Sequence, residues 1–455
     1  MSADAAVVWF RRDLRLADQP TLLAAAEAAP HGLALFVLDQ RLLGPAGAAR
    51  TVFLHRCLRD LDDALGGRLL VASGEPAEVV PRVARQHGAD TVHVAADFGP
   101  YGRERDDAVA AALAADNREL VRSGSPYAVA PGRVRKADGE PFKVFSPFRQ
   151  AWGRHGWRRP AETSAATLEW LEPKGGVAIP ADGRTDAEPP AAGEQAALDA
   201  WQDFAAQRLD DYAHARDRPD QPGTSRMSVY LKYGCIHPRT MLADLVERCG
   251  AGAESYRTEL AWREFYADVL WHRPDSARAN YDRRFDAMPH ESGASAEQRF
   301  SAWKDGRTGF PIVDAGMRQL RAQAWMHNRV RMIVASFLVK DLHLPWWWGA
   351  RHFMNLLVDG DLASNQHGWQ WVAGSGTDAA PYFRVFNPVT QGERFDPDGS
   401  YVRRYVEELA GVDGKRVHRP WELPSGPPLG YPAPIVDHAV ERNVALAHYD
   451  EVRAR

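Results

Sequence analysis

The chain has 455 residues, of which 45% are hydrophobic and 25% are charged, as in soluble globular proteins and unlike disordered or fibrous ones. Its formal net charge of -4 argues against a uniformly basic nucleic-acid-binding surface, although a local basic face can still contact phosphate. The three cysteines are scattered and odd in number, which argues against a disulfide framework and for a reducing compartment. They also lack the spacing of metal ligands, and we expect no metal.

The first residues do not have the pattern of a signal peptide, and no apolar run is long enough to span a bilayer. We therefore expect a cytoplasmic protein. At about 150 residues for each domain, the length predicts two or three domains.

Short apolar runs alternate with alanine-rich, helix-like segments in the first part of the chain. The expected strands cover residues 5–10, 33–39, 68–72 and 91–96, and the expected helices cover residues 21–29, 51–65, 76–87 and 104–115. This alternation predicts an α/β domain with a doubly wound parallel sheet. Ligands of such sheets bind at the carboxyl ends of the strands, where Asp39 and Asp97 stand.

The segment after the first strand contains Arg11-Arg12-Asp13 and has no Gly-x-Gly-x-x-Gly fingerprint, which argues against an ordinary dinucleotide dehydrogenase. The arginines there fit a solvated turn and a binding role equally well.

Residues 171–197 are rich in Pro, Gly, Ala and acids, a composition typical of an exposed connection between domains. Beyond them the strand pattern stops, and helical periodicity covers residues 195–210, 238–248, 255–271, 312–325, 328–343 and 350–358. We expect an α/β domain over residues 1–130, a connector over 131–197 and a larger all-α domain over 198–455.

Residues 357–371 combine two carboxylates, an amide and two indoles within a short stretch. Trp369 and Trp371 are two positions apart, so on a helix they cannot share a face. One indole could face the protein interior while the other lines a cavity for a flat ligand. The alternative is that the acids cap a helix and the tryptophans pack in the core.

A turn at residues 222–228 carries hydroxyl side chains and Arg226 ahead of an expected helix. Free backbone N–H groups and a guanidinium at such a place suit a phosphate, but ordinary helix capping is the alternative.

Helical spacing puts Glu259, Trp262 and Arg263 on one face, where an indole can stack on a base and a carboxyl can bond it. The alternative for this face is a surface ion pair between Glu259 and Arg263 over a core tryptophan.

The same spacing groups Asn328, Arg331 and Met332, an unusual set for a core and a plausible one for a pocket that holds a flat heterocycle. The neighbouring His327 is interpreted as structural. The run 346–348 contains three tryptophans, which cannot all be buried on one helical face and could serve binding or an electron path.

Taken together, these stretches resemble the photolyase/cryptochrome flavoprotein family over nearly the whole chain. Motifs at residues 8–15, 223–226, 259–266, 325–332, 359–371, 376–382 and 386–388 match in order. The chain looks like a class I cyclobutane pyrimidine dimer photolyase.

The resemblance implies an antenna-binding α/β domain and a helical domain that binds FAD and DNA. It also implies light-driven repair of pyrimidine dimers in damaged DNA, by electron transfer from excited reduced FAD to a flipped-out dimer. We expect a monomer with no membrane association and no obligate protein partner. The alternative is a signalling cryptochrome, which has the same fold and FAD but performs no repair.

The resemblance also implies a role for each of several residues. The pocket for the dimer is assigned to Glu259, Trp262, Asn328, Met332 and Trp371. Asn328 stands where six-four photolyases have the second histidine of a pair, which favours the cyclobutane lesion. Contacts to FAD are assigned to Tyr212, Thr224, Ser225, Arg226, Met227, Ser228, Tyr256, Arg331, Asp359, Gly360, Asp361 and Asn365. Contacts to DNA are assigned to Arg263, Arg329, Arg384 and Gln391.

Trp369 and Trp346 match the inner tryptophans of the family's electron relay, but no tryptophan stands near Gly293, where the outermost one is expected. We hypothesise that Trp347 or Trp348 ends the path. An antenna chromophore is expected at Asp39, Arg50, Asp97, Arg105 and Lys232. We expect 8-hydroxy-5-deazaflavin there, with methenyltetrahydrofolate as the alternative.

Overall fold

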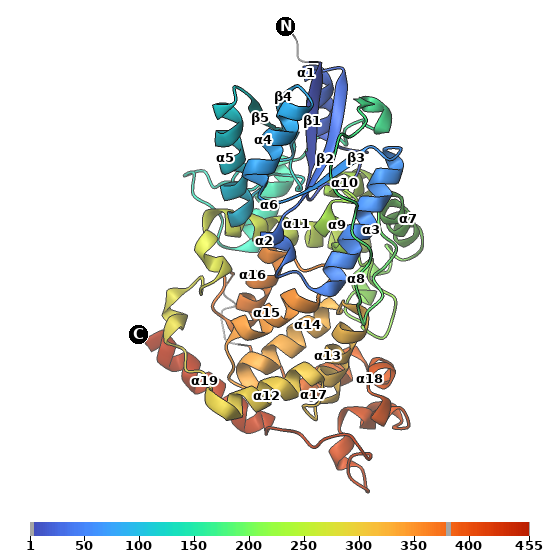
Figure 1. Cartoon of the computed structure of the whole chain (residues 1–455). Helices are drawn as coiled ribbons and strands as arrows, with labels where there is room; N and C mark the ends of the chain where they lie inside the picture. Colours follow the sequence, from blue (N-terminus) through green and yellow to red (C-terminus); the bar gives the residue numbers. More distant parts are fainter. Residues whose placement is uncertain (1–3, 379–383, 455) are drawn as a thin grey trace.

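The computed structural model describes residues 4–378 and 384–454. Figure 1 shows a sheet with its helices at one end of the molecule and a mass of helices, formed by the second half of the chain, at the other.

The sheet contains five parallel strands in the order β3-β2-β1-β4-β5, and a short sixth strand pairs with β2. The strands are β1 (Ala5–Phe10), β2 (His31–Leu38), β3 (Leu69–Ser73), β4 (Ala89–Val94), β5 (Glu119–Arg122) and β6 (Glu169–Trp170). All pairings are parallel, which confirms the predicted doubly wound sheet. The strand order reverses between β1 and β4, and their carboxyl ends open toward the helical part.

Alternate side chains of the central strands enter two different cores, because successive residues of a strand point to opposite faces. Val7 and Trp9 of β1 pack with α4 (Pro76–Gln86) and α5 (Pro100–Ala115), whereas Val8 and Phe10 pack with α1 (Pro20–Ala28) and α3 (Ala48–Ala64). A short helix, α2 (Gln40–Leu43), follows β2. Both faces of the sheet are therefore covered, as its apolar strands require.

The second half is helical, as expected. Its helices are α7 (Glu194–Gln207), α8 (Tyr212–Ala215), α9 (Ser228–Tyr233), α10 (Pro238–Val246), α11 (Ala251–His272), α12 (Gly293–Asp305), α13 (Pro311–Gln323), α14 (Asn328–Ser336), α15 (Trp346–Leu356), α16 (Leu362–Ala373), α17 (Pro388–Phe395), α18 (Ser400–Tyr405) and α19 (His438–Ala454). A π-helix, Phe337–Asp341, follows α14, so the helix expected over 328–343 changes its winding near the middle.

Short 3-10 turns complete the chain: Ala165–Thr167, Pro274–Ala277, Arg283–Ala287, Glu407–Leu409, Gly414–His418 and Pro420–Glu422. None of the helices in the described ranges is both long and apolar enough to cross a membrane.

The two halves share one hydrophobic core cluster, which extends from the strands into the helical part. Phe53 of α3 and Tyr233 of α9, for example, have ring centroids 4.8 Å apart. The expected connector contributes α6 (Phe145–His155), which packs against α11, and strand β6. The domain limits at 130 and 197 remain predictions.

Candidate functional site

A cavity of about 510 Å³ lies among the helices of the second half, and we call it the helical-domain cavity. Its wall combines stretches that are far apart in sequence: the loop before α9, the middle of α11, α14, and the segment that enters α16. Every residue assigned to the dimer pocket and every residue assigned to FAD lines this one cavity. The structure thus brings these residues together, while their individual roles remain predictions.

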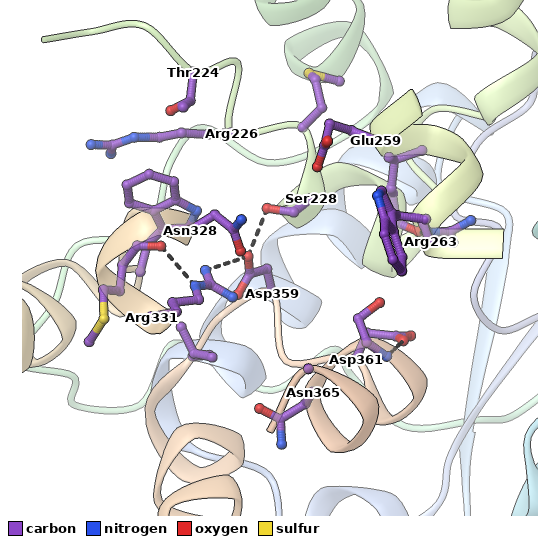
Figure 2. A pocket seen from close by; sticks show the side chains of 18 of the residues that line it. Thr224, Arg226, Ser228, Glu259, Arg263, Asn328, Arg331, Asp359, Asp361 and Asn365 are labelled. Carbon is purple, nitrogen blue, oxygen red and sulfur yellow. Dashed lines mark hydrogen bonds and ion pairs between the residues drawn. The ribbon is translucent and has the colours of Figure 1, made fainter. Parts of the chain in front are cut away.

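Asp359 is held inside this wall by a cation and a hydroxyl. Arg331 Nη2 and Ser228 Oγ both donate to Asp359 Oδ2, at 2.8 Å and 2.7 Å (Figure 2). The other oxygen, Oδ1, is buried and has no hydrogen-bond partner in the part of the chain that the structure describes. A buried carboxylate oxygen without a donor is costly, so this atom indicates a ligand that donates to it.

The loop before α9 does not cap the helix in the ordinary way. Met227 is the N-cap residue and its side chain makes no capping bond, while Ser225 Oγ bonds Tyr256 Oη at 2.7 Å. Arg226 has φ of 55° and its guanidinium lies 4.3 Å from the ring centroid of Trp325. The hydroxyl and guanidinium groups of this loop thus face the cavity, which favours the binding interpretation over capping.

Asp361 is the N-cap of α16 and also forms an ion pair with the α/β domain. Its Oδ1 accepts from Ser364 N at 3.1 Å, and its Oδ2 lies 2.7 Å from Arg12 Nη2. Burial favours the protonated form, but the charges of Arg12, Lys232 and Arg263 outweigh it and hold the pKa of Asp361 below its usual range. Asp361 therefore remains a carboxylate. Capping, the alternative considered above, is one of its two roles here.

Asn365 lies on the first turn of α16 at the cavity wall (Figure 2). Its Nδ2 donates to Ala350 O at 3.1 Å and to Gln366 Oε1 at 2.9 Å. These bonds fix the orientation of the amide on the helix.

Glu259 pairs with Arg216, not with Arg263 as the surface-pair alternative required. Arg216 Nη1 lies 2.7 Å from Glu259 Oε1. Burial raises the pKa of Glu259, and the Arg216 charge opposes that rise. Because Glu259 also lines the cavity, it offers a partly desolvated acid to whatever enters.

Trp262 is held face to face against Phe145 of α6, with ring centroids 3.6 Å apart and an angle of 8° between the planes. The indole is half-buried and lines the cavity, as does the half-buried Trp371 of α16. Sequence reasoning did not identify Phe145, because it lies in the expected connector. A rigid indole at a cavity wall is suited to stacking on a base.

On α14, Asn328 and Met332 line the cavity beside Arg331. The imidazole Nδ1 of His327 accepts from Arg329 N at 3.2 Å, so this residue caps α14, consistent with a structural role.

The four residues expected to contact DNA lie in different surroundings. Arg263 donates to Pro126 O at 3.0 Å and Leu231 O at 3.2 Å, so its guanidinium bonds mainly within the protein. Arg329 lines the cavity and pairs with Asp217 at 2.9 Å. Arg384 is exposed and Gln391 is half-buried on α17, and neither lines the cavity. The part of the Gly376-to-Tyr382 motif at residues 379–383 lies outside the described residues.

The tryptophans expected to carry electrons form two chains of ring contacts. Trp369 is buried with its ring 6.1 Å from Trp303, which stacks on Phe300 at 5.8 Å, and Phe300 lies 5.2 Å from Trp348. Trp303 was not identified from the sequence, because its position on α12 has no distinguishing pattern.

The second chain joins Trp346 to its neighbour Trp347. Trp346 is buried and donates through Nε1 to Asn280 Oδ1 at 2.9 Å. Its ring lies 5.9 Å from that of Trp347, which is 37% exposed. Trp347 therefore reaches the solvent, as the proposed end of an electron path must.

A second cavity of about 1170 Å³ lies between the sheet and the helical part, and we call it the interface cavity. It opens at the carboxyl ends of β1, β2 and β4 and is closed on the other side by α15 and residues 277–286. All five residues expected to bind an antenna line it: Asp39, Arg50, Asp97, Arg105 and Lys232. Burial and the nearby Arg12 charge lower the pKa of Lys232 to about 7.

Comparisons with known proteins agree with this geometry. A protein-family model described as DNA photolyase matches residues 6–166. A second family model, described as the FAD binding domain of DNA photolyase, matches residues 256–451. A Streptomyces griseus protein named deoxyribodipyrimidine photo-lyase is 42% identical, over 96% of this chain and 97% of its own length.

Two solved structures are also similar. A class III photolyase from Agrobacterium tumefaciens has a TM-score of 0.92 and 38% identity, and the match covers 100% of this chain and 99% of that one. An archaeal photolyase from Sulfolobus tokodaii, described with two FAD molecules, has a TM-score of 0.86 and 30% identity, over 98% of this chain and 100% of that one. The chain therefore belongs to the DNA photolyase family.

Proposed function

We propose that this protein is a deoxyribodipyrimidine photo-lyase that repairs cyclobutane pyrimidine dimers in DNA under light, with FAD bound in the helical-domain cavity. The observation that carries the proposal is the convergence of five dimer-pocket residues and twelve FAD residues, drawn from separated motifs, on one cavity wall. The full-length similarity to a protein of that name supports the same activity.

The residues present fit FAD. The cavity offers cationic donors at Arg226 and Arg331 and a hydroxyl donor at Thr224, which suit a diphosphate and ribityl chain, while Ser228 Oγ already donates to Asp359. It also offers the unpartnered Asp359 Oδ1 as an acceptor for a hydroxyl or N–H donor. When bound and reduced, FAD supplies the light-excited electron that splits the cyclobutane ring and then returns.

The protein's own part is to receive the lesion in the helical-domain cavity. A dimer must leave the duplex to enter a cavity, and this extrusion costs a few kcal/mol, least for a damaged and poorly stacked site. Stacking on Trp262 and Trp371 returns about 1–3 kcal/mol for each base. The stack of Trp262 on Phe145 holds its ring ready, so little freedom is lost on binding.

Glu259 serves the reacting bases directly in this proposal. Its pKa is raised by burial, and it keeps one guanidinium partner, Arg216, which steadies the carboxyl group. A carboxyl group fixed in this way can hydrogen-bond the dimer and stabilise charge that develops on it.

The test is repair of ultraviolet-irradiated thymine oligonucleotides under blue light by the reduced, FAD-loaded protein. We expect dimer loss under light and none in the dark. Glu259→Gln should lower the yield about 10-fold or more while FAD remains bound. Glu254→Gln, an exposed acid on the same helix, should leave the yield unchanged.

Absence of light-dependent dimer loss with FAD bound and reduced would overturn the repair proposal and favour the cryptochrome alternative. Loss of FAD in the Glu259 variant would instead show that this face of α11 serves the cofactor.

We also propose a second chromophore in the interface cavity, where the five expected residues lie. The planar rings of Trp9, Tyr101 and Trp347 in its wall suit an aromatic ligand. Our proposed ligand is 8-hydroxy-5-deazaflavin, and methenyltetrahydrofolate is the alternative. Mass and absorption spectra of the chromophores released from the purified protein distinguish them. The class I assignment also stays a proposal, since the similar Agrobacterium structure is named class III.

Damaged DNA is the proposed macromolecular substrate. In this proposal Arg263 and Arg329 contact it at the wall of the helical-domain cavity, and Arg384 and Gln391 contact it outside that wall. The protein acts as a cytoplasmic monomer with access to the nucleoid. Salt dependence of binding to irradiated DNA counts the phosphate contacts that each residue contributes.

A further inference from the structure

We propose that Arg12 is a positioning residue of the catalytic site: from the α/β domain and the wall of the interface cavity it fixes the helix that carries Asn365, Trp369 and Trp371. The inference rests on the proposed FAD site, because α16 forms part of that wall. It makes the FAD site depend on a side chain outside the helical domain.

Arg12 lies two residues beyond the end of β1 and is 349 residues from its partner Asp361 along the chain. Its Nη2 donates to Asp361 Oδ2 at 2.7 Å, with side-chain exposures of 28% and 15%. Figure 2 shows Asp361 at the cavity, where the chain enters α16. Arg12 acts on α16 through this carboxylate.

The two carboxylate oxygens of Asp361 bind different groups. Oδ2 accepts a hydrogen bond from Arg12, and Oδ1 accepts one from Ser364 N in the first turn of α16. If the guanidinium were absent, the carboxylate would lose its main charge partner and could turn away from the helix N-terminus. The first turn of α16, which holds Asn365, would then lose its cap.

The backbone around Arg12 is also held firmly against the helical part. A Cβ added to Gly234, which has φ of +70°, would lie 2.0 Å from Arg12 O, so the two backbones touch there. Leu14 N donates to Tyr233 O at 3.1 Å, and Arg15 Nη1 donates to Gly234 O at 3.1 Å. The exit of β1 is thus anchored to the end of α9, which lets Arg12 reach across at a fixed place.

Arg12 also faces the second cavity. It lines the interface cavity, and its buried Nε has no hydrogen-bond partner among the described residues. Lys232 lines both cavities, whereas Arg12 reaches the helical-domain cavity only through Asp361. A ligand in the interface cavity that shifts the Arg12 guanidinium therefore also acts on Asp361 of the flavin site, and by linkage each ligand must then alter the other's affinity.

The neighbouring arginine provides a matched control. Arg11 also lines the interface cavity, but its Nη1 pairs with Asp106 of α5 at 2.8 Å, inside the α/β domain. Removal of either arginine deletes one cation from the interface cavity, and only removal of Arg12 releases Asp361.

The experiment compares Arg12→Gln, Arg12→Lys, Arg11→Gln, Asp361→Asn and the Arg12→Gln/Asp361→Asn pair in the full chain. We measure the FAD dissociation constant on reconstitution of the apoprotein, and hydrogen exchange of the amides at residues 362–365 before FAD is added. Arg12→Gln should raise the dissociation constant about 10–100-fold and speed this exchange about 10-fold or more. For Arg12→Lys, both the dissociation constant and the exchange rate should lie between those of the parent and of Arg12→Gln, because lysine keeps the positive charge but lacks the forked guanidinium. For Arg11→Gln, the dissociation constant and the exchange rate should both stay within about twofold of the values for the parent.

The double variant decides the route. If Arg12 acts through Asp361, the pair should bind FAD no more weakly than the worse single variant; independent, multiplying effects would overturn the inference. So would unchanged FAD binding and exchange in Arg12→Gln. Failure of the unmodified protein to bind FAD would instead defeat the proposed function, and the exchange measurement would still test Arg12. If Arg12→Gln does not fold, Arg12→Lys against Arg11→Gln decides by the same criteria.

Discussion

The helical-domain cavity and the interface cavity differ in how their charges are arranged. In the helical-domain cavity, two of the three carboxylates among the described residues of the wall pair with cations of the same wall, Asp359 with Arg331 and Glu259 with Arg216. The third, Asp361, pairs with Arg12 of the interface cavity. The interface cavity has eight cationic side chains and three carboxylates, and buried nitrogens of Trp9, Arg12 and Arg50 lack partners among the described residues. The first cavity is thus organised to hold a ligand in one orientation, and the second retains positive charge for an anionic group.

The largest effect is expected where a paired charge in the helical-domain cavity is removed. Arg331→Ala leaves the Asp359 carboxylate buried without its cation, which typically costs about 3–5 kcal/mol. We expect a drop of that size in the free energy of unfolding and at least about 100-fold weaker FAD binding, measured by denaturation and by FAD titration.

Arg329→Ala, on the same helix, is the control. Its partner Asp217 is 39% exposed, so the expected loss of stability is about 1 kcal/mol or less, with FAD retained. Equal effects in the two variants would show that charge pairing does not organise this cavity.

The stacking surface of the same cavity should give the next effect. Trp262→Ala removes the indole that is held against Phe145, and binding to dimer-containing DNA should weaken by about 1–3 kcal/mol. Trp262→Phe keeps a ring in place and should recover most of the affinity. Electrophoretic mobility assays on irradiated and intact duplexes measure the affinity of the parent and of each variant. On intact DNA the variants should bind as tightly as the parent.

For the interface cavity we expect a pH dependence. Burial lowers the pKa of Lys232 to about 7, so the side chain is charged below that pH and neutral above it. An anionic second chromophore should therefore bind about fivefold more weakly at pH 8 than at pH 6. Equilibrium dialysis of the released chromophore measures this, and Lys232→Met should give a flat profile. A chromophore held equally well at both pH values would show that the positive wall does not select charge.

The smallest effect should separate the two chains of tryptophans. Trp347→Phe interrupts the chain that ends at the exposed ring, and Trp348→Phe interrupts the chain that passes through Trp303 and Phe300. We expect a reduction of about threefold or more in the rate of flavin photoreduction for the variant on the working chain, measured by flash absorption. As a control, the rate of repair after chemical reduction of the flavin should be the same in the parent and in both variants. A double variant as fast as the parent would exclude both termini.

Much of the fold could be predicted from local pattern. The apolar runs of β1 to β4 are buried on both faces, and burial of this kind leaves a continuous hydrophobic signature in the sequence. Strand β5 escaped prediction because Glu119 and Arg122 flank only Leu120 and Val121, and β6 is two residues long. Helix α15 begins at Trp346, earlier than expected, because Pro345 fixes its N-cap.

The sequence by itself determined the alternation of strands and helices, the residue types of the FAD and dimer pockets, and the resemblance that connects them. Only the tertiary structure decided which side chains from distant parts of the chain meet: the ion pairs of Glu259 with Arg216 and of Asp361 with Arg12, and the stacked rings of Trp262 and Phe145. Periodicity reports which residues share a face within one element. It carries no information on pairs separated by tens or hundreds of residues, whose meeting depends on how whole elements pack.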